Sequence, residues 1–451
     1  MTTIQMLNRL SYTWTIVLIV LSYSAQVAVG QEYMTLPRAI SIGLENNYSL
    51  KIAEQYIAIA DNNDTWAKAG RTPTIDLTGS FGNSITQNNN PASFIQGAYY
   101  SGSLSAGLTG SYTLYAGGRI KIAKEQLGLA AANERLARES EVHDLMKNIW
   151  QQYYSVLFEK ERLTVLEQSL DLSRSRLAYE RIRRDFGTSN TYSIVQFENA
   201  LMADSINVVS QEQQVEVALR KFYDVLDMDY EPDFVYEERL SVTDEVLDAE
   251  QLKQLMSESS YTLKSLEMIS AVSSLNTKLA RAARQPTVAL TGNLSFTENG
   301  FKLWQENDMT GEPFPFVLGN QVTGGVGATL SYNLYDGGVR STDIESAQMQ
   351  EVADRMTVEQ ARANLLSQLD LLVTNYQNQR DLLQLSDEQI QLAQQNIDIT
   401  EERFKTGVVS SLDYRAVQLQ YINAAFAKVS AIYNLLLTKS EVDYLVGRFD
   451  Y

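Results

Sequence analysis

The chain has 451 residues, and its 37 Lys and Arg against 55 Asp and Glu give a formal net charge of −18. A chain this acidic has no basic face that could neutralise phosphates, which argues against nucleic acid as a partner. It has no cysteine, which excludes disulfides, thiolate metal sites, thiol nucleophiles and the N-terminal lipid anchor of a lipoprotein.

Residues 1–30 predict a secretory signal peptide. They contain Arg9, then the apolar run 15–21, then small residues that end at Gly30, which are the three regions of such a signal. The run is too short for a spanning helix, which needs about 20 apolar residues. We therefore expect export and cleavage before Gln31.

Two stretches are nearly identical, SYTLYAGGRI at 111–120 and SYNLYDGGVR at 331–340, and they lie 220 residues apart. The match predicts an internal duplication, so other features should recur at the same offset. Apolar residues at every seventh position do recur: Ile149, Val156, Leu163, Leu170 and Leu177, then Leu369, Tyr376, Leu383, Ile390 and Ile397. This spacing is typical of long helices that pack side by side.

The first repeat is expected to span 31–226. In chain order it should contain a helix within 33–70, a β-hairpin at 74–115, a long helix at 117–185 and a return helix at 193–226. Residues 227–250 hold ten acidic side chains and only Arg239 as a base, so they should form a solvated connector at the equator of the molecule.

The second repeat, 251–451, should follow the same order. We expect a helix at about 250–283, a hairpin at 287–335, a long helix at 338–405 and a return helix at 411–446. The hairpins leave two loops, 87–101 and 297–321. The second loop is rich in aromatic residues, which could pack on a rim or narrow a mouth.

The four expected strands alternate apolar residues with small or hydroxylic ones, a pattern typical of the wall of an outer-membrane barrel. Taken singly, each strand could equally belong to a half-buried soluble sheet. Four strands cannot close a barrel, so this interpretation requires several copies of the chain.

The repeated stretch itself predicts a junction between strand and helix. Paired glycines permit the sharp turn of the backbone, and tyrosines suit a membrane interface because the ring is apolar and the tip polar. The junction residues are Tyr112, Tyr115, Gly117 and Gly118, with Tyr332, Tyr335, Gly337 and Gly338 in the second repeat.

Three features of the sequence belong together: these junctions, the two halves that each combine a hairpin with a long helix, and the stretch FKTGVVSSLDY at 404–414. In these features the mature sequence resembles the TolC family of outer-membrane efflux channels. The resemblance implies a mainly α fold with membrane β: a homotrimer with one twelve-stranded β-barrel in outer-membrane lipid and a periplasmic α-barrel of coiled-coil helices. It also implies a passive exit duct for efflux or type I secretion, coupled through a periplasmic adaptor (membrane fusion) protein to an inner-membrane pump.

The resemblance further assigns roles to the helix tips. It places adaptor docking at Phe186, Gly187, Thr188, Thr406, Gly407, Val408, Val409 and Ser410. An aspartate six residues after the tip glycine contributes to the periplasmic aperture in this family, which points to Asp413. The first repeat has Ser193 at the matching position, so the ring would hold three carboxylates. Asp413 could instead be an ordinary N-terminal helix aspartate that offsets the helix dipole.

No constellation of residues indicates catalysis, a cofactor or a metal. The single histidine, His143, lies in a helical pattern without a second ligand of its type, and Glu401 and Glu402 are adjacent on a helix, so their carboxylates do not face each other. The sequence contains no phosphate-binding loop and no G-x-S-x-G motif. A non-conducting coiled-coil surface scaffold or adhesin is the alternative from another functional class.

Overall fold

The computed structural model describes residues 33–230, 239–242, 245–306 and 311–449. The expected signal peptide, 1–30, and part of the acidic connector lie outside this range. The chain divides into two compact units, and both long helices contribute to each of them. Unit 1 comprises Met1–Lys51, Ser140–Ser260 and Leu365–Tyr451, and unit 2 comprises Ile52–Glu139 and Tyr261–Asn364.

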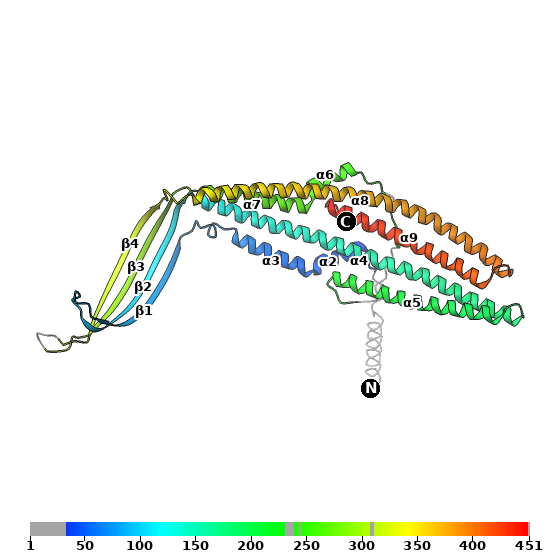
Figure 1. Ribbon diagram of the computed structural model, residues 1–451, viewed down its shortest axis with the longest axis horizontal. Helices are drawn as coiled ribbons and strands as arrows, with labels where there is room; N and C mark the ends of the chain where they lie inside the picture. Colours follow the sequence, from blue (N-terminus) through cyan, green and yellow to red (C-terminus); the bar gives the residue numbers. More distant parts are fainter. Residues whose placement is uncertain (1–32, 231–238, 243–244, 307–310, 450–451) are drawn as a thin grey trace, which may run out of the picture. The chain divides into compact units, whose positions relative to one another are not determined.

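Helices form most of the described chain, and four strands form one sheet (Figure 1). In the first repeat the elements are α2 Leu36–Asn46, α3 Tyr48–Asn63, β1 Thr74–Asn88, β2 Gly97–Ala116, α4 Arg119–Asp185 and α5 Thr191–Val225. In the second they are α6 Ala249–Ser259, α7 Tyr261–Ala282, β3 Thr287–Leu303, β4 Val317–Ser331, α8 Val339–Lys405 and α9 Ser411–Leu445.

The helices on the tip side confirm the duplication. Both long helices, α4 and α8, have 67 residues, and both return helices, α5 and α9, have 35. Each end of α8 lies 220 positions after the matching end of α4, and the same holds for α9 and α5. The offset found in the sequence therefore relates these helices residue by residue.

Each repeat has two helices before its hairpin, where the sequence analysis expected one. Asn47 separates α2 from α3: its side-chain oxygen accepts the N–H of Leu50 at 3.1 Å, and Asp227 accepts the N–H of Tyr48 at 3.2 Å. Ser260 separates α6 from α7 with a non-helical ψ of 118°. A side-chain cap makes the first break and a local backbone conformation the second, and apolar periodicity reveals neither.

The sheet has the strand order β1-β2-β3-β4, and all neighbours are antiparallel. The strands are longer than expected because the β1–β2 ladder continues to the pair Asn88 and Gly97, and the β3–β4 ladder to Phe301 and Val317. The expected loops 87–101 and 297–321 therefore shrink to 89–96 and 304–316.

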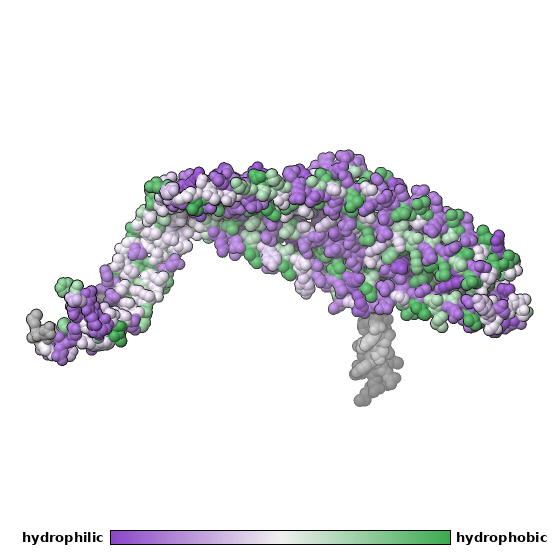
Figure 2. Space-filling view, in the orientation of Figure 1, coloured by the Kyte–Doolittle hydropathy of each residue, from purple (hydrophilic) through white to green (hydrophobic). Residues whose placement is uncertain are grey.

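The core of unit 1 contains residues that recur at every seventh position of the sequence. Ile149, Val156, Leu369 and Tyr376 are almost completely buried, and the largest apolar cluster forms around Tyr153 and the ends of α2 and α5. Among the described residues, no helix is long and apolar enough to cross a membrane. The helical surface is a mosaic of hydrophilic and hydrophobic patches (Figure 2).

Candidate functional site

The two helix tips have the same backbone geometry. After α4, the N–H of Gly187 donates to Arg184 and that of Thr188 to Arg183; after α8, the N–H of Gly407 donates to Phe404 and that of Val408 to Arg403. This is the Schellman arrangement, which needs a left-handed residue. Gly187 and Gly407 supply it with φ values of 74° and 78°.

Each tip continues into its return helix through a capping side chain. Asn190 accepts the N–H of Ser193 at 2.9 Å, and Ser410 accepts the N–H of Asp413 at 3.2 Å. The Ser410 hydroxyl also donates to the Asp413 carboxylate at 2.7 Å. Asp413 thus has the geometry of a helix N-terminal aspartate, and the arrangement does not test its expected place at an aperture.

Most of the expected docking residues are exposed in the chain. Phe186 is 80% exposed and Val408 75%, and Gly187, Thr188, Thr406, Gly407 and Ser410 are also exposed. Val409 differs because it packs against the cluster formed by Phe404, Tyr414 and their neighbours. The tips of the single chain therefore present a short apolar and hydroxylic surface.

Behind the tips lies a buried polar network that the sequence analysis missed. Asp204 on α5, only 1% exposed, accepts two hydrogen bonds from Arg415 on α9, at 2.7 and 2.6 Å, and one from the Ser173 hydroxyl on α4 at 2.6 Å. Gln418 on α9 donates to Ser173 at 3.1 Å. The network joins three helices of unit 1.

A sequence signal for this network does exist. Phe197, Asp204, Gln211 and Ala218 follow one another at every seventh position of α5, and all four are buried. A polar residue at such a position must find partners on the neighbouring helices, because a buried charge is costly without them. The polar residues in this series therefore mark the places where hydrogen bonds or ion pairs join neighbouring helices.

A second ionic group lies between the network and the tips. Arg176 on α4 contacts Glu401 on α8 at 2.5 Å and donates to the Tyr414 hydroxyl on α9 at 3.0 Å. Hydrogen bonds from Arg176 and then from Lys405 lower the pKa of Glu401, and burial raises the pKa of Tyr414. Glu401 stays ionised and attached to Arg176, and Arg176 thereby links α4 to α8 and α9 of the second repeat.

The two junctions in unit 2 are not equivalent. Tyr112 and Tyr115 belong to β2. In the second repeat β4 ends at Ser331, so Tyr332 and Tyr335 lie after the strand, and the hairpin ends at 331 and not at the expected 335. The reason is pairing: β2 lies between two strands, while β4 pairs only with β3, whose first residue, Thr287, already faces Ser331.

The glycines of the junctions have positive φ values, 61° and 85° at Gly117 and Gly118, and 71° and 91° at Gly337 and Gly338. Their surroundings differ. A side chain on Gly117 would meet Gln285 and the carbonyl of Ala282, whereas Gly337 faces open space.

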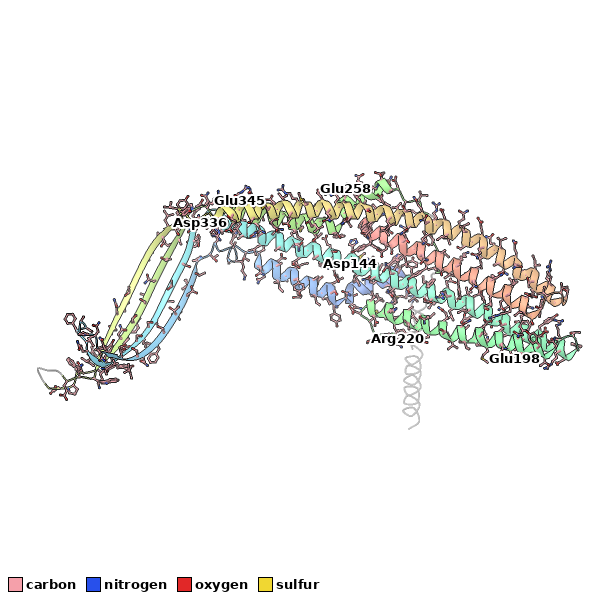
Figure 3. The ribbon with its side chains drawn as sticks, in the orientation of Figure 1. Asp144, Glu198, Arg220, Glu258, Asp336 and Glu345 are labelled. Atoms are coloured by element: carbon pink, nitrogen blue, oxygen red, sulfur yellow. The ribbon has the colours of Figure 1, made fainter. Side chains whose placement is uncertain are left out.

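The second junction has a cap that the first one lacks. The carboxylate of Asp336 (Figure 3) accepts the N–H of Gly338 at 3.1 Å and that of Arg340 at 3.2 Å. Arg340 also donates to Asp336 through its side chain, to the carbonyl of Asn333 at 2.9 Å and to that of Ala283 at 3.3 Å. The position of Asp336 is Ala116 in the first repeat.

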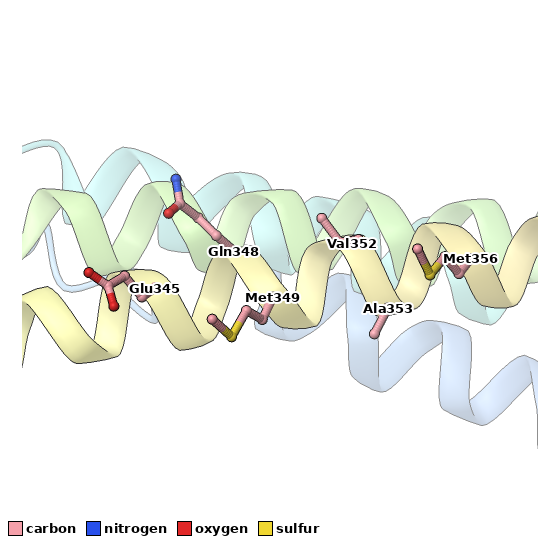
Figure 4. A pocket seen from close by; sticks show the side chains of 6 residues that line it. All are labelled: Glu345, Gln348, Met349, Val352, Ala353 and Met356. Carbon is pink, nitrogen blue, oxygen red and sulfur yellow. The ribbon is translucent and has the colours of Figure 1, made fainter.

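Nothing in the described ranges is arranged like a catalytic centre. No three His, Asp or Glu side chains within them are grouped to hold a metal ion. One hollow is lined by α8 alone, with Glu345 and Gln348 at one end and Met349, Val352 and Met356 beyond them. Figure 4 shows these side chains along α8.

The model of one protein family, outer membrane efflux protein, matches residues 39–226 and 253–448. The chain belongs to this family. Its two matched segments correspond to the two repeats, and the family makes this protein an efflux channel of the outer membrane and not an enzyme.

Solved structures agree on the fold of this efflux channel. The Campylobacter jejuni CmeC outer membrane channel is 15% identical, with a TM-score of 0.72 over 92% of this chain and 87% of that one. Vibrio cholerae VceC is 15% identical, with a TM-score of 0.71 over 91% and 96%. The open state of Neisseria gonorrhoeae MtrE is 16% identical, with a TM-score of 0.70 over 91% and 88%. A search of curated proteins found no match.

Proposed function

We propose that three copies of this chain form one passive exit duct of a tripartite efflux or type I secretion system. In this proposal, each copy gives four strands to a single twelve-stranded barrel in outer-membrane lipid. A periplasmic adaptor couples the helix tips to an inner-membrane pump, which supplies the energy.

The observation that carries this proposal is the pairing of the strands. β1 pairs only with β2, and β4 only with β3, so each keeps one unpaired edge within the chain. Unpaired N–H and C=O groups cost several kcal/mol each in hydrocarbon, so an open sheet is not viable there. The edges of β1 and β4 from neighbouring copies satisfy one another when the sheet closes.

Apolar faces next to these edges support the same assembly. On α3, which leads into β1, Ile52, Tyr56 and Ile59 are exposed, and on α8, which follows β4, Met349 and Met356 are exposed. Both helix faces would be covered by a neighbouring copy, which accounts for apolar side chains at helical spacing on the surface of a single chain.

The tips support coupling to an adaptor. Both end in glycines: a side chain on Gly187 would meet open space, and one on Gly407 would meet only the Arg183 guanidinium, at 3.8 Å. The exposed Phe186 and Val408 are apolar. A helical partner could approach such a surface closely. Around the threefold axis, the Asp413 carboxylates of three copies would form an acidic ring, which together with the chain's net charge of −18 would favour cations.

The test uses two valines of equal exposure in a strain from which the gene is deleted. Val408, at a tip, is 75% exposed, and Val246, in the connector, is 76% exposed. Val408→Trp should leave the particle trimeric but raise susceptibility to a panel of dyes, bile salts and detergents to that of the deletion strain. Val246→Trp is the control and should restore wild-type resistance. Full resistance with Val408→Trp would refute docking at the tips.

A further inference from the structure

A hollow of about 380 Å³ in unit 2 lies where β2 ends and α4 begins. The residues that line it include Trp66, Arg71, Tyr112, Ala116 and Lys121. A second hollow, of about 530 Å³, shares Trp66, Arg71 and Tyr112 with the first and reaches Leu290 on β3. We call the two together the junction hollow. Its wall has a basic part, with Arg71 and Lys121, and an apolar part, with Tyr112 and Leu290.

The apolar part belongs to the apolar face of the sheet. Tyr112 lies opposite Leu290, and an irregularity in the ladder places Tyr115 opposite Val288. Opposite residues share a face, as do residues two positions apart on one strand. The irregularity therefore turns both tyrosines to one face, although they are three positions apart. Leu108, four positions before Tyr112, lies on this face as well.

This face would meet lipid in the proposed duct, because the other face of the strands carries small and hydroxylic side chains. β2 and β3 are the inner strands of the sheet, and the free edges belong to β1 and β4. Joining these edges between copies leaves Tyr112 and Leu290 away from the new contact. The hollow would then lie at the helix end of the barrel, at the level of the lipid headgroups, where Trp and Tyr are enriched.

The basic part has no acidic partner. The guanidinium of Arg71 lies 4.8 Å from the ring centre of Trp66, and neither Arg71 nor Lys121 forms an ion pair with any carboxylate in the described ranges. Segments 64–73 and 112–124 contain a single acid, Asp64, which binds Lys124 at 2.6 Å. Their bases are Lys68, Arg71, Arg119, Lys121 and Lys124. These segments are therefore strongly basic within a chain of net charge −18.

The second repeat fills the equivalent positions differently. Counted from the proline before each hairpin, Arg284 is the equivalent of Arg71, and the offset of 220 makes Ser341 the equivalent of Lys121. Arg284 donates a hydrogen bond to Ser341 at 3.2 Å. In the first repeat the same contact would bring two cations together, and like charges repel.

The second junction also has its own carboxylate. Asp336 is bound there by Arg340, whereas its equivalent in the first repeat, Ala116, lines the hollow with a methyl group. The first junction thus combines two cations with no carboxylate between them. This arrangement is complementary to an anion, above all to a phosphate, which accepts charge-assisted hydrogen bonds from Arg and Lys.

We propose that the junction hollow binds a phospholipid with an anionic headgroup, with its phosphate at Arg71 and Lys121 and an acyl chain along Tyr112 and Leu290. Trp66 lines both parts of the hollow and suits the boundary between them, because its ring is apolar and its N–H polar. A free anion would leave the apolar part uncovered. The proposal rests on the duct proposed above, since strands in outer-membrane lipid bring lipid to this face. It gives one site for each chain and three for a trimer.

The test is a titration of the detergent-solubilised protein with phosphatidylglycerol, followed by native mass spectrometry, which shows bound lipids and oligomeric state together. The wild type should retain one lipid for each chain. Arg71→Gln with Lys121→Gln should lower the affinity at least about tenfold, because each base near an anionic headgroup contributes to binding. Inorganic phosphate equimolar with the lipid should not displace it. Displacement would assign the hollow to a free anion and overturn the proposal.

Lys68→Gln with Arg119→Gln is the matched control. It removes the same charge from the same two segments, at exposed positions that do not line the hollow, and should change the affinity less than about twofold. An equal loss in both double variants would indicate diffuse attraction and overturn the site.

Ala116→Asp tests the site while both cations remain. It installs the residue of the second junction, where an aspartate caps the turn, so the junction should still fold. The new carboxylate should lower the affinity about as much as Arg71→Gln with Lys121→Gln, and wild-type binding would overturn the proposal. Wild-type trimers without bound lipid would overturn the site and leave the duct intact, whereas a protein that is not trimeric would refute the duct itself.

Discussion

Arg415 on α9 binds both carboxylate oxygens of Asp204 on α5, and the aspartate is almost completely buried. Removal of one partner leaves the other charge buried and unpaired. The pair also lies in the network that joins α5 and α9 to Ser173 on α4. It should therefore stabilise the tip half of unit 1 far more than an exposed ion pair does.

We predict that Arg415→Val lowers the free energy of unfolding by about 3 kcal/mol, the cost typical of a broken buried pair. Arg415→Val combined with Asp204→Ala installs the residues of the repeat-equivalent positions and should recover most of this loss. Arg174→Ala breaks the exposed pair with Asp171 and should cost under about 1 kcal/mol. Denaturant unfolding of the solubilised protein gives these values. Equal losses for Arg415→Val and Arg174→Ala would contradict the assignment.

Asp413 takes part in the capped start of α9 through its contacts with Ser410, and this part can be separated by mutation from the aperture charge proposed for it. Ser410→Ala removes the cap and should cost about 1 kcal/mol without changing ion selectivity. Asp413→Asn keeps the amide N–H that Ser410 accepts but removes the charge. It should weaken cation selectivity and divalent block in planar-bilayer recordings. If Asp413→Asn left both properties unchanged in a well-folded trimer, Asp413 would not belong to an aperture ring.

The junction glycines provide a comparison between the repeats. Gly337→Ala should cost about 1–2 kcal/mol, because only the left-handed backbone opposes it. Gly117→Ala should cost more, since the new methyl would lie 2.4 Å from Cβ of Gln285 and 2.7 Å from the Ala282 carbonyl oxygen. Thermal unfolding midpoints of the two variants measure the difference. A larger effect at Gly337 would contradict the packing around Gly117.

The lowered pKa of Glu401 predicts a dependence of stability on pH. Its usual value is near 4.5, and hydrogen bonds from Arg176 and Lys405 hold it lower in the folded chain. The contribution to stability is therefore present above about pH 4.5 and is lost as the pH falls through the lowered value. Glu401→Gln should reduce the unfolding midpoint at pH 7, and its difference from wild type should shrink as the pH is lowered from 4.5 towards 3. A constant difference across this range would argue against an ionic role, and the exposed Glu402→Gln serves as control.

Periodicity in the sequence predicted the features that depend on repeated burial. The sevenfold spacing from Ile149 to Leu177 placed the helix seam correctly, and the alternating strands and paired glycines marked the hairpins and junctions. Strand lengths were underestimated because pairing with a neighbour extends a strand beyond its alternating segment, as at Asn88 and Gly97.

The network around Asp204 was missed for a different reason. Its members come from α4, α5 and α9, and only the packing of three helices brings Ser173, Asp204 and Arg415 together. A single polar residue at a seam position gives no indication of its partner. The breaks at Asn47 and Ser260 are likewise set by side chains and backbone conformations that local periodicity does not encode.

The central claim, that three chains complete one duct, is tested most directly by the mass of the particle extracted from outer membranes in mild detergent. Light scattering with the detergent contribution subtracted should give three times the 50.7 kDa of the full chain, less the three cleaved signal peptides. The same fractions should produce single-channel currents in planar bilayers. A stable monomer that remains inserted in membranes would contradict the claim, because its β1 and β4 edges would then lie unpaired in lipid.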